Sequence, residues 1–312
     1  MQRRTRILAI VAAVLLAVGA VSGAVVFRQV DGIARDNLAN RTFVRGHQQL
    51  PSEFGIPYEN VTVPSGDLAL AGWWMPATSP APDALTVVLV HGLGSNMSKV
   101  VRMWAPHLHG LGYNLLSIDL RNHGASPDTD PPYVTYGNDE ADDVAAAVAY
   151  VRAHAGETGI DPERIVLYGG SMGGATVLNA AARSLPGVIG VLSDSSFASL
   201  SFQAHLDGDE QGYPGFVVGW VLDRMDALAP SPPTKSRPDL AVQGLAISLL
   251  LAHCDDDTRI EAASFERLKH LAPTGTTTWN EPCPRGPSTD HHLDGWMAAS
   301  YNATVAGFLA GL

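Results

Sequence analysis

The chain has 312 residues, of which 46% are hydrophobic, and a formal net charge of -11 at pH 7. A chain of this length and apolar content can bury a large core, whereas the acidic excess argues against a nucleic-acid-binding surface. With two cysteines and no zinc-site spacing, phosphate-binding loop or dinucleotide fingerprint, the sequence predicts neither a metal nor a cofactor.

Residues 1–30 have the pattern of a membrane segment. Residues 7–27 carry no charge and as a helix would span about 31 Å, the thickness of a bilayer's hydrocarbon core. Arginines precede this run and Arg28 alone follows closely, which predicts a cytoplasmic N-terminus and export of the remainder. The alternative is a cleaved signal peptide, with small residues at 22–24 as its cleavage site, and hence a secreted protein. Both interpretations predict an extracytoplasmic domain.

A linker is expected over residues 31–57, followed by one domain over residues 58–312. Two strand-like stretches within residues 58–77 flank a turn and predict an opening hairpin. Beyond them, short apolar runs alternate with stretches long enough for helices, which predicts a βαβ series with a mostly parallel sheet. These runs are residues 87–90, 114–119, 165–168, 188–193 and 245–252.

A serine stands among glycines where one of these strands is expected to turn into a helix. Glycines at 169, 170, 173 and 174 remove the β-carbons that would block a sharp turn and a close crossing. The spacing Gly169-x-Ser171-x-Gly173 is the pattern of a nucleophile elbow. Because the pattern is short, assigning Ser171 as a nucleophile also requires an oxyanion loop upstream of it and an acid and a histidine downstream.

Three motifs in the expected order carry a resemblance to a known superfamily. They are "HGLG" at 91–94, "DLRNHGAS" at 119–126 and "GGSMGG" at 169–174. The chain resembles α/β-hydrolases from about residue 58 to its end, most of all the small-lidded, dienelactone-hydrolase-like or prolyl-oligopeptidase-like serine hydrolases. The resemblance implies an α/β fold with helices on both faces of the sheet and a small lid, here preceded by one transmembrane helix.

The resemblance also implies roles for residues beside the serine. The backbone N–H groups of Leu93 and Met172 would form the oxyanion hole, which stabilises charge on a carbonyl oxygen under attack. His91 and His123 lie in turn motifs upstream of Ser171, where the resemblance implies scaffold histidines. The acidic residues of segment 136–144 are expected in the first turn of a helix rather than around a metal.

The acid of a catalytic triad is expected after the strand that ends near residue 252. Three adjacent aspartates follow, and spacing alone leaves the choice among them open. The family motif H-G-x-x-D-x-x-V matches residues 253–260, with Cys in place of Gly and Ile in place of Val. That match aligns Asp257 with the triad acid and leaves Asp255 and Asp256 as loop or capping residues.

The triad histidine should come last, and the sequence offers His291 and His292. Relatives commonly carry it four residues before an aromatic that opens the final helix, which matches His292 and Trp296. The order Ser171, Asp257, His292 then follows the superfamily's order of nucleophile, acid and base.

The acid loop and the histidine loop follow adjacent strands in the resembling fold, which makes Cys254 and Cys283 plausible neighbours. An exported domain meets oxidising conditions, so we expect these cysteines to form a disulfide. Two unrelated free thiols are the alternative.

The stretch of about 50 residues before the strand near 245 exceeds a crossover helix and predicts a lid over about 195–243. Phe202, Phe216, Val217 and Trp220 would line an acyl pocket or pack on the core. The leading interpretation is a serine hydrolase that cleaves carboxylic esters of small or lipid-like acyl substrates. The alternatives are a peptidase or acyltransferase on the same triad, or a membrane-tethered binding protein without catalysis. The oligomeric state is left open.

Overall fold

The computed structural model describes residues 23–39, 49–79, 84–283 and 299–312. Within them, eight strands form one sheet in the order β1-β2-β4-β3-β5-β6-β7-β8. β2 runs antiparallel to β1 and β4, and the other neighbours are parallel. The strands are β1 (Glu59–Ser65), β2 (Leu68–Met75), β3 (Thr86–Val90), β4 (Asn114–Ile118), β5 (Ile165–Gly170), β6 (Val188–Asp194), β7 (Ser248–Cys254) and β8 (Thr277–Glu281).

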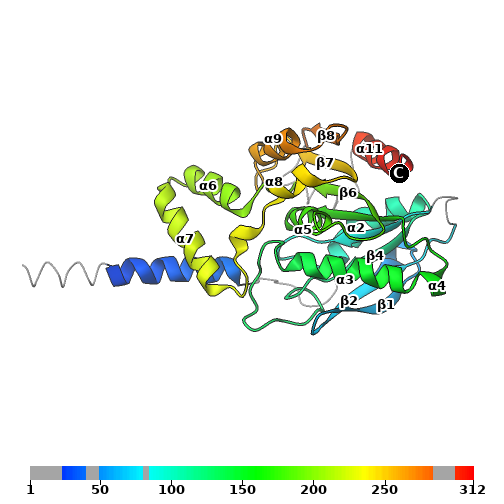
Figure 1. The fold of residues 1–312 in the computed structure, drawn as a ribbon, viewed down its shortest axis with the longest axis horizontal. Helices are drawn as coiled ribbons and strands as arrows, with labels where there is room; N and C mark the ends of the chain where they lie inside the picture. The colour runs from blue at the N-terminus through cyan, green and yellow to red at the C-terminus, as the bar shows by residue number, and fades with distance from the viewer. Residues whose placement is uncertain (1–22, 40–48, 80–83, 284–298) are drawn as a thin grey trace, which may run out of the picture.

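Helices cover both faces of this sheet (Figure 1). Alternate residues of a strand point to opposite faces. Val88 and Val90 of β3 therefore pack in one core with α3 and α5, whereas Val87 and Leu89 pack in the other with α2 and α11. The helices are α2 (Met97–Gly110), α3 (Glu140–Ala153), α4 (Ala155–Thr158), α5 (Met172–Ala181), α9 (Ala262–Leu271) and α11 (Ala299–Ala310).

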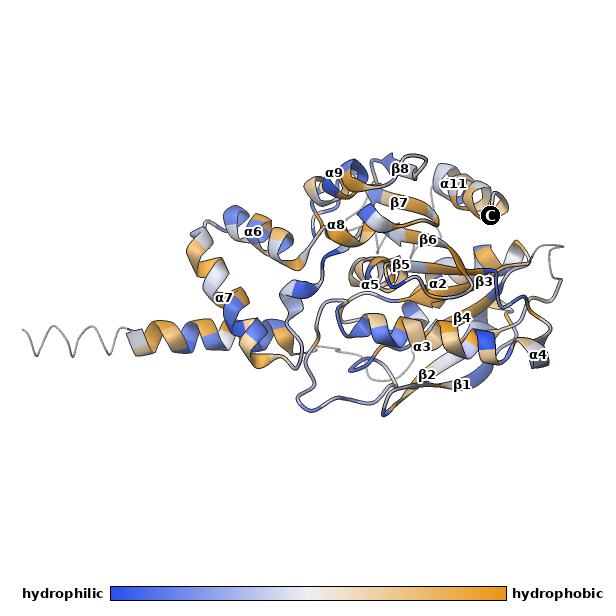
Figure 2. Cartoon of the chain, in the orientation of Figure 1, coloured by the Kyte–Doolittle hydropathy of each residue, from blue (hydrophilic) through white to orange (hydrophobic). Residues whose placement is uncertain are grey.

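The central strands are buried on both faces because helices cover them on both sides. Every residue of β3, β4 and β5 is buried, and Figure 2 shows hydrophobic colour along the middle of the sheet. Side chains buried on both faces explain why these strands appear in the sequence as continuous apolar runs. The parallel arrangement brings the carboxyl ends of the strands to one edge, where a site is expected in such folds.

A lid connects β6 to β7. Its two longer helices project from the sheet beside the N-terminal helix (Figure 1). Ser199 caps the first of them by accepting a hydrogen bond from the backbone N–H of Phe202. The lid elements are α6 (Leu200–Glu210), α7 (Gly215–Leu228), η2 (Pro233–Lys235), α8 (Pro238–Ala241) and η3 (Val242–Gly244).

The N-terminal helix occupies described residues 23–38, so the expected linker over 31–57 is helical at its start and again at η1 (Pro51–Phe54). Asp31 of this helix forms an ion pair with Arg224 of α7 at 2.6 Å. None of the helices among the described residues is long and apolar enough to cross a membrane. Most of the apolar run 7–27, on which the membrane prediction rests, lies outside the described residues.

Candidate active site

Ser171 lies at the sharp turn between β5 and α5, at the carboxyl edge of the sheet. Its backbone angles are φ 55° and ψ -123°, a conformation that a non-glycine residue rarely adopts. Its N–H donates to the carbonyl oxygen of Asp194 at 2.8 Å, which holds the turn against β6. Strain of this kind persists where the surrounding structure enforces it, and it is common at catalytic residues.

Two glycines make this turn possible. A β-carbon on Gly169 would lie 2.2 Å from the carbonyl oxygen of Gly173, and one on Gly173 would lie 2.3 Å from the carbonyl oxygen of Val90. Real side chains do not tolerate such distances from backbone atoms. The start of α5 can therefore cross β5 and β3 closely only because both positions lack a side chain.

The loop after β3 lies against Ser171. A β-carbon on Gly92 would lie 3.7 Å from the hydroxyl oxygen of Ser171. Leu93 follows in this loop and is 44% exposed, while Met172, the first residue of α5, is buried. Leu93, Ser171 and Met172 line the same cavity. Both elements expected to supply an oxyanion hole thus flank the serine.

The acid loop follows β7, and its three aspartates differ in surroundings. Asp257 is buried, and one of its carboxylate oxygens accepts hydrogen bonds from the N–H groups of Arg259 and Ile260 at 2.8 and 3.1 Å. Asp255 and Asp256 are exposed. Asp256 accepts a hydrogen bond from the N–H of Cys283 at 2.6 Å. The candidate acid is therefore the one aspartate of the three that is enclosed by its own loop.

Cys254 and Cys283 form a disulfide in the structure, with a distance of 5.4 Å between their α-carbons. The bond joins the end of β7 to the segment that follows β8. His291 and His292 lie outside the described residues. The assignment of His292 as the triad base therefore stays a prediction.

The two upstream histidines are held by backbone contacts below the site. His91 is fully buried, and its Nε2 accepts the N–H of Leu120 at 3.1 Å. His123 is also fully buried, its Nδ1 lies 2.8 Å from the carbonyl oxygen of Arg121, and the two imidazole rings are 4.9 Å apart. These contacts fit the scaffold roles expected for both residues.

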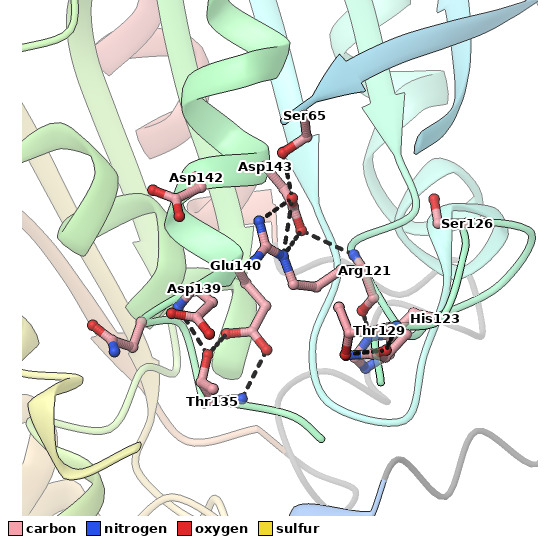
Figure 3. Close-up of polar contacts among 12 residues, drawn as sticks. Ser65, Arg121, His123, Ser126, Thr129, Thr135, Asp139, Glu140, Asp142 and Asp143 are labelled. Atoms are coloured by element: carbon pink, nitrogen blue, oxygen red, sulfur yellow. Dashed lines mark hydrogen bonds and ion pairs between the residues drawn. The ribbon is translucent and has the colours of Figure 1, made fainter. Parts of the chain in front are cut away.

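The acids of segment 136–144 stabilise a turn and a helix start (Figure 3). Glu140 is fully buried and accepts hydrogen bonds from Thr135 and Gly137, and burial raises the pKa of its carboxyl group. Asp143 forms a bidentate ion pair with Arg121. Within the described part of the chain, no three His, Cys, Asp or Glu residues are grouped so as to hold a metal ion.

A cavity of about 520 Å³ opens at Ser171 and extends beneath the lid. Its walls are mainly apolar, as in sites that take hydrophobic ligands. Of the four aromatic and aliphatic side chains considered from sequence, Val217 lines it, Phe216 and Trp220 are exposed, and Phe202 packs against Arg267. The lid residues along the cavity are Leu200, Gln203, Ala204, Asp207, Gly208, Gln211, Tyr213, Val217, Val218, Val221, Leu222 and Met225.

The N-terminal helix supplies another wall of this cavity through Ile33 and Asn37. Its ion pair from Asp31 to Arg224 and the contact of the Arg224 guanidinium with the ring of Phe27, at 5.3 Å, hold it against α7. Sequence reasoning missed this wall because the segment was expected to be a linker. Arg259, which also lines the cavity, was missed as well; its position two residues after Asp257 was the available signal.

Comparison with known proteins places this geometry in a family. The model of the alpha/beta hydrolase family matches residues 87–307. The uncharacterized protein YfhR of Escherichia coli strain K12 is 31% identical over 208 residues, which make up 65% of this chain and 64% of YfhR. The chain thus aligns with less than two thirds of the length of that relative.

Solved structures resemble the chain over most of its length. An esterase of Pyrococcus furiosus matches with a TM-score of 0.63 at 22% identity and covers 86% of this chain and 98% of the esterase. Dipeptidyl peptidase 4 of Porphyromonas gingivalis matches with a TM-score of 0.58 at 18% identity, over 82% of this chain and 35% of the peptidase. At these identities the likeness establishes the fold.

Proposed function

Because the chain belongs to the alpha/beta hydrolase family, we propose that it is a serine hydrolase that cleaves carboxylic esters through an acyl-enzyme on Ser171. One observation carries the proposal: the strained serine opens directly into a cavity of about 520 Å³ beneath the lid, and the walls of this cavity are mainly apolar. Such a cavity suits an aliphatic acyl chain, whose burial is favourable by about 0.8 kcal/mol for each CH₂ group.

The mechanism assigns one task to each group. His292 takes the proton of Ser171 as the serine attacks the acyl carbonyl, and it then gives that proton to the departing alcohol. Asp257 orients the imidazole and stabilises its charged form. The N–H groups of Leu93 and Met172 hold the oxyanion. Water then hydrolyses the acyl-enzyme, so the products are a carboxylic acid and an alcohol.

Peptide hydrolysis and acyl transfer on the same triad are the second candidates. The fold is shared with an esterase and with a dipeptidyl peptidase, so the fold alone does not separate them. The mainly apolar lining beneath the lid favours an acyl chain over a peptide, because each backbone amide of a buried peptide would need a hydrogen-bond partner. A binding protein without catalysis remains the candidate of another class.

We also propose that residues 1–30 anchor the domain to a membrane, with the domain on the extracytoplasmic side. The described start of the N-terminal helix supports this, since Val26 and Phe27 are exposed apolar residues that end the uncharged run. On the adjoining helix α7, Phe216 and Trp220 are 61% and 49% exposed, with ring centroids 5.1 Å apart. Trp220 lines a groove together with Val26 and Phe27. Aromatic side chains of this kind are favoured at a lipid interface.

The test of the catalytic proposal is active-site labelling with a fluorophosphonate, followed by hydrolysis of p-nitrophenyl esters of graded acyl length. We expect Ser171 to be labelled, Ser171→Ala to lose both label and turnover, and medium or long acyl chains to give a higher kcat/KM than acetate. Labelling that persists in Ser171→Ala would overturn the nucleophile assignment. A labelled protein that cleaves peptides but no ester would favour the peptidase instead.

A further inference from the structure

Arg259 is an exposed cation fixed next to the nucleophile. Its N–H donates to the carboxylate of Asp257 at 2.8 Å, and its carbonyl oxygen accepts the side-chain N–H of Gln203 at 3.2 Å. The backbone of Arg259 is thus tied to the acid loop on one side and to α6 on the other. Its side chain lines the main cavity and, together with Leu93 and Ser171, a small cavity of about 40 Å³.

The charge of Arg259 has no counter-charge in the described part of the chain. No described carboxylate lies within ion-pair distance of its guanidinium. Five other arginines of the domain each form an ion pair with an aspartate: Arg121, Arg183, Arg224, Arg237 and Arg267. A guanidinium is planar and presents donors that match carboxylate and phosphate oxygens, so an unpaired one beside a nucleophile suits an anionic ligand group.

Arg259 lines two cavities near the nucleophile. The lid cavity, which Ser171 also lines, is mainly apolar. A second cavity, of about 450 Å³, is more polar, and it is lined by Asp36, Asn37, Ala39, Leu93, Gly94, Tyr136 and Arg259. An ester bound at Ser171 with its acyl chain beneath the lid would extend its alcohol toward this second cavity. Two other charged residues line these spaces: Asp36 lines the second cavity, and Lys99 lines the small cavity of about 40 Å³. Each of them already has an interaction partner.

We propose that Arg259 binds an anionic group on the alcohol part of the substrate, so that the preferred substrates are acyl esters whose alcohol carries a phosphate or a carboxylate. This inference rests on the proposed ester hydrolysis. Ser171 forms its acyl bond as the ester C–O bond breaks, and the anionic alcohol leaves with the proton from His292. Arg259 contacts the substrate away from the bond that breaks, so it acts on kcat/KM through binding rather than on the chemical step.

The experiment compares three esters that differ only at the alcohol: the octanoyl esters of glycerol, of glycerol 3-phosphate and of glycerate. The readout is the ratio of kcat/KM for each anionic ester to that for the neutral one. In the wild type the ratio exceeds one, and in Arg259→Gln it falls about tenfold, the effect of losing a charge-assisted hydrogen bond. Arg259→Lys keeps part of the ratio. Arg102→Gln, which removes a cation from an outer cavity that Ser171 does not line, leaves it unchanged.

The outcomes separate this inference from the function on which it rests. If Arg259→Gln lowers kcat/KM only for the phosphate ester or only for the glycerate ester, that result identifies the anion that Arg259 binds. An equal loss for all three esters in Arg259→Gln would overturn the inference, because it would mean that the residue only positions Asp257. Binding of octyl phosphate to Ser171→Ala, measured by calorimetry and weakened in Ser171→Ala/Arg259→Gln, would support the anion site even if no ester were cleaved. That combination of results would overturn the proposed ester hydrolysis and leave the anion site supported.

Discussion

The backbone of Gly92 lies so close to Ser171 that a β-carbon on Gly92 would be 3.2 Å from the β-carbon of Ser171. The same atom would lie 3.1 Å from the carbonyl oxygen of Gly170. We expect Gly92→Ala to push the Leu93 loop away from the nucleophile and to lower kcat by about 10- to 100-fold, because a displaced oxyanion donor should cost less than the loss of a donor, which lowers kcat by about 10²- to 10³-fold. Ester hydrolysis and the melting temperature of the variant are the measurements.

Gly219→Ala is the matched control, because a β-carbon at Gly219 in α7 would meet nothing within 4 Å. It should leave kcat unchanged and stabilise the helix slightly. A Gly92→Ala variant with wild-type turnover would mean that the loop after β3 does not bind the oxyanion.

Asp257 and Asp255 differ in burial although they are two residues apart. Asp257→Asn should lower turnover by about 10³- to 10⁴-fold while the fold persists, because the amide holds the imidazole in the wrong tautomer. Asp255→Asn should stay close to wild type, and so should Asp256→Asn. If Asp255→Asn were the inactive variant, the triad acid would be misassigned.

The base is tested in the same assay. His292→Ala should abolish turnover, and His291→Ala should retain it. Imidazole added to the His292→Ala variant should restore part of its activity if the missing group is a general base. Equal activity of the two variants would contradict the assignment.

The disulfide between Cys254 and Cys283 spans a sequence separation of 29 residues. In the chain-entropy model such a bond stabilises by roughly 3 to 4 kcal/mol. We expect the double variant Cys254→Ala/Cys283→Ala to unfold at a lower temperature than the oxidised wild type, and dithiothreitol to lower the wild-type temperature toward that of the variant. The reductant should leave the variant unchanged, which is the internal control.

Asp239 of α8 joins the end of the lid to α9 through ion pairs with Arg237 and Arg267. Burial alone would raise the pKa of Asp239, but the two guanidinium groups outweigh it and hold the pKa below its ordinary value of 3.8. A carboxyl group with a lowered pKa in the folded state stabilises above pH 3.8, and the contribution is lost as the pH falls through the lowered value.

Asp239→Asn should therefore destabilise at pH 7 by about 2 kcal/mol, and its difference from wild type should narrow as the pH approaches 3. Urea unfolding at a series of pH values measures this. Asp142→Asn, which breaks the exposed pair with Arg183, should cost less than about 1 kcal/mol. A difference that stays constant with pH would show that the Asp239 contribution is not electrostatic.

The anchor prediction concerns the full-length chain, which should sediment with membranes and resist extraction by salt. Deletion of residues 1–30 should release it, because the apolar run is then absent. A native chain that begins near Val25 in the soluble exported fraction would instead favour a cleaved signal peptide.

The central strands could be predicted from the sequence because burial on both faces restricts their residues to apolar types. The apolar runs became β3 to β7 since helices cover both faces of those strands. Gly169 and Gly173 predicted the close crossing because no other residue permits it. By contrast, β8 has a single buried side chain, Trp279, and its polar edge position gives no apolar run.

The cavity was less predictable, since its walls come from segments distant in the chain. Asp31 and Arg224 are 193 residues apart, and their contact brings Ile33 to the lid. No local pattern encodes a pairing over that distance. The location of Arg259 beside the cavity likewise depends on where α6 and the acid loop meet.

The wall formed by Ile33 and Asn37 limits how far the protein can be shortened before its substrate range changes. Proteolytic maturation near Val25 would remove the apolar leader and keep that wall. A recombinant chain trimmed to residue 49 for solubility would keep the whole described sheet, yet it would leave the side of α7 that faces Ile33 open to water. The shortened protein would have a wider and more hydrated cavity than the native enzyme, so the acyl-chain preferences measured on it would differ from the native ones.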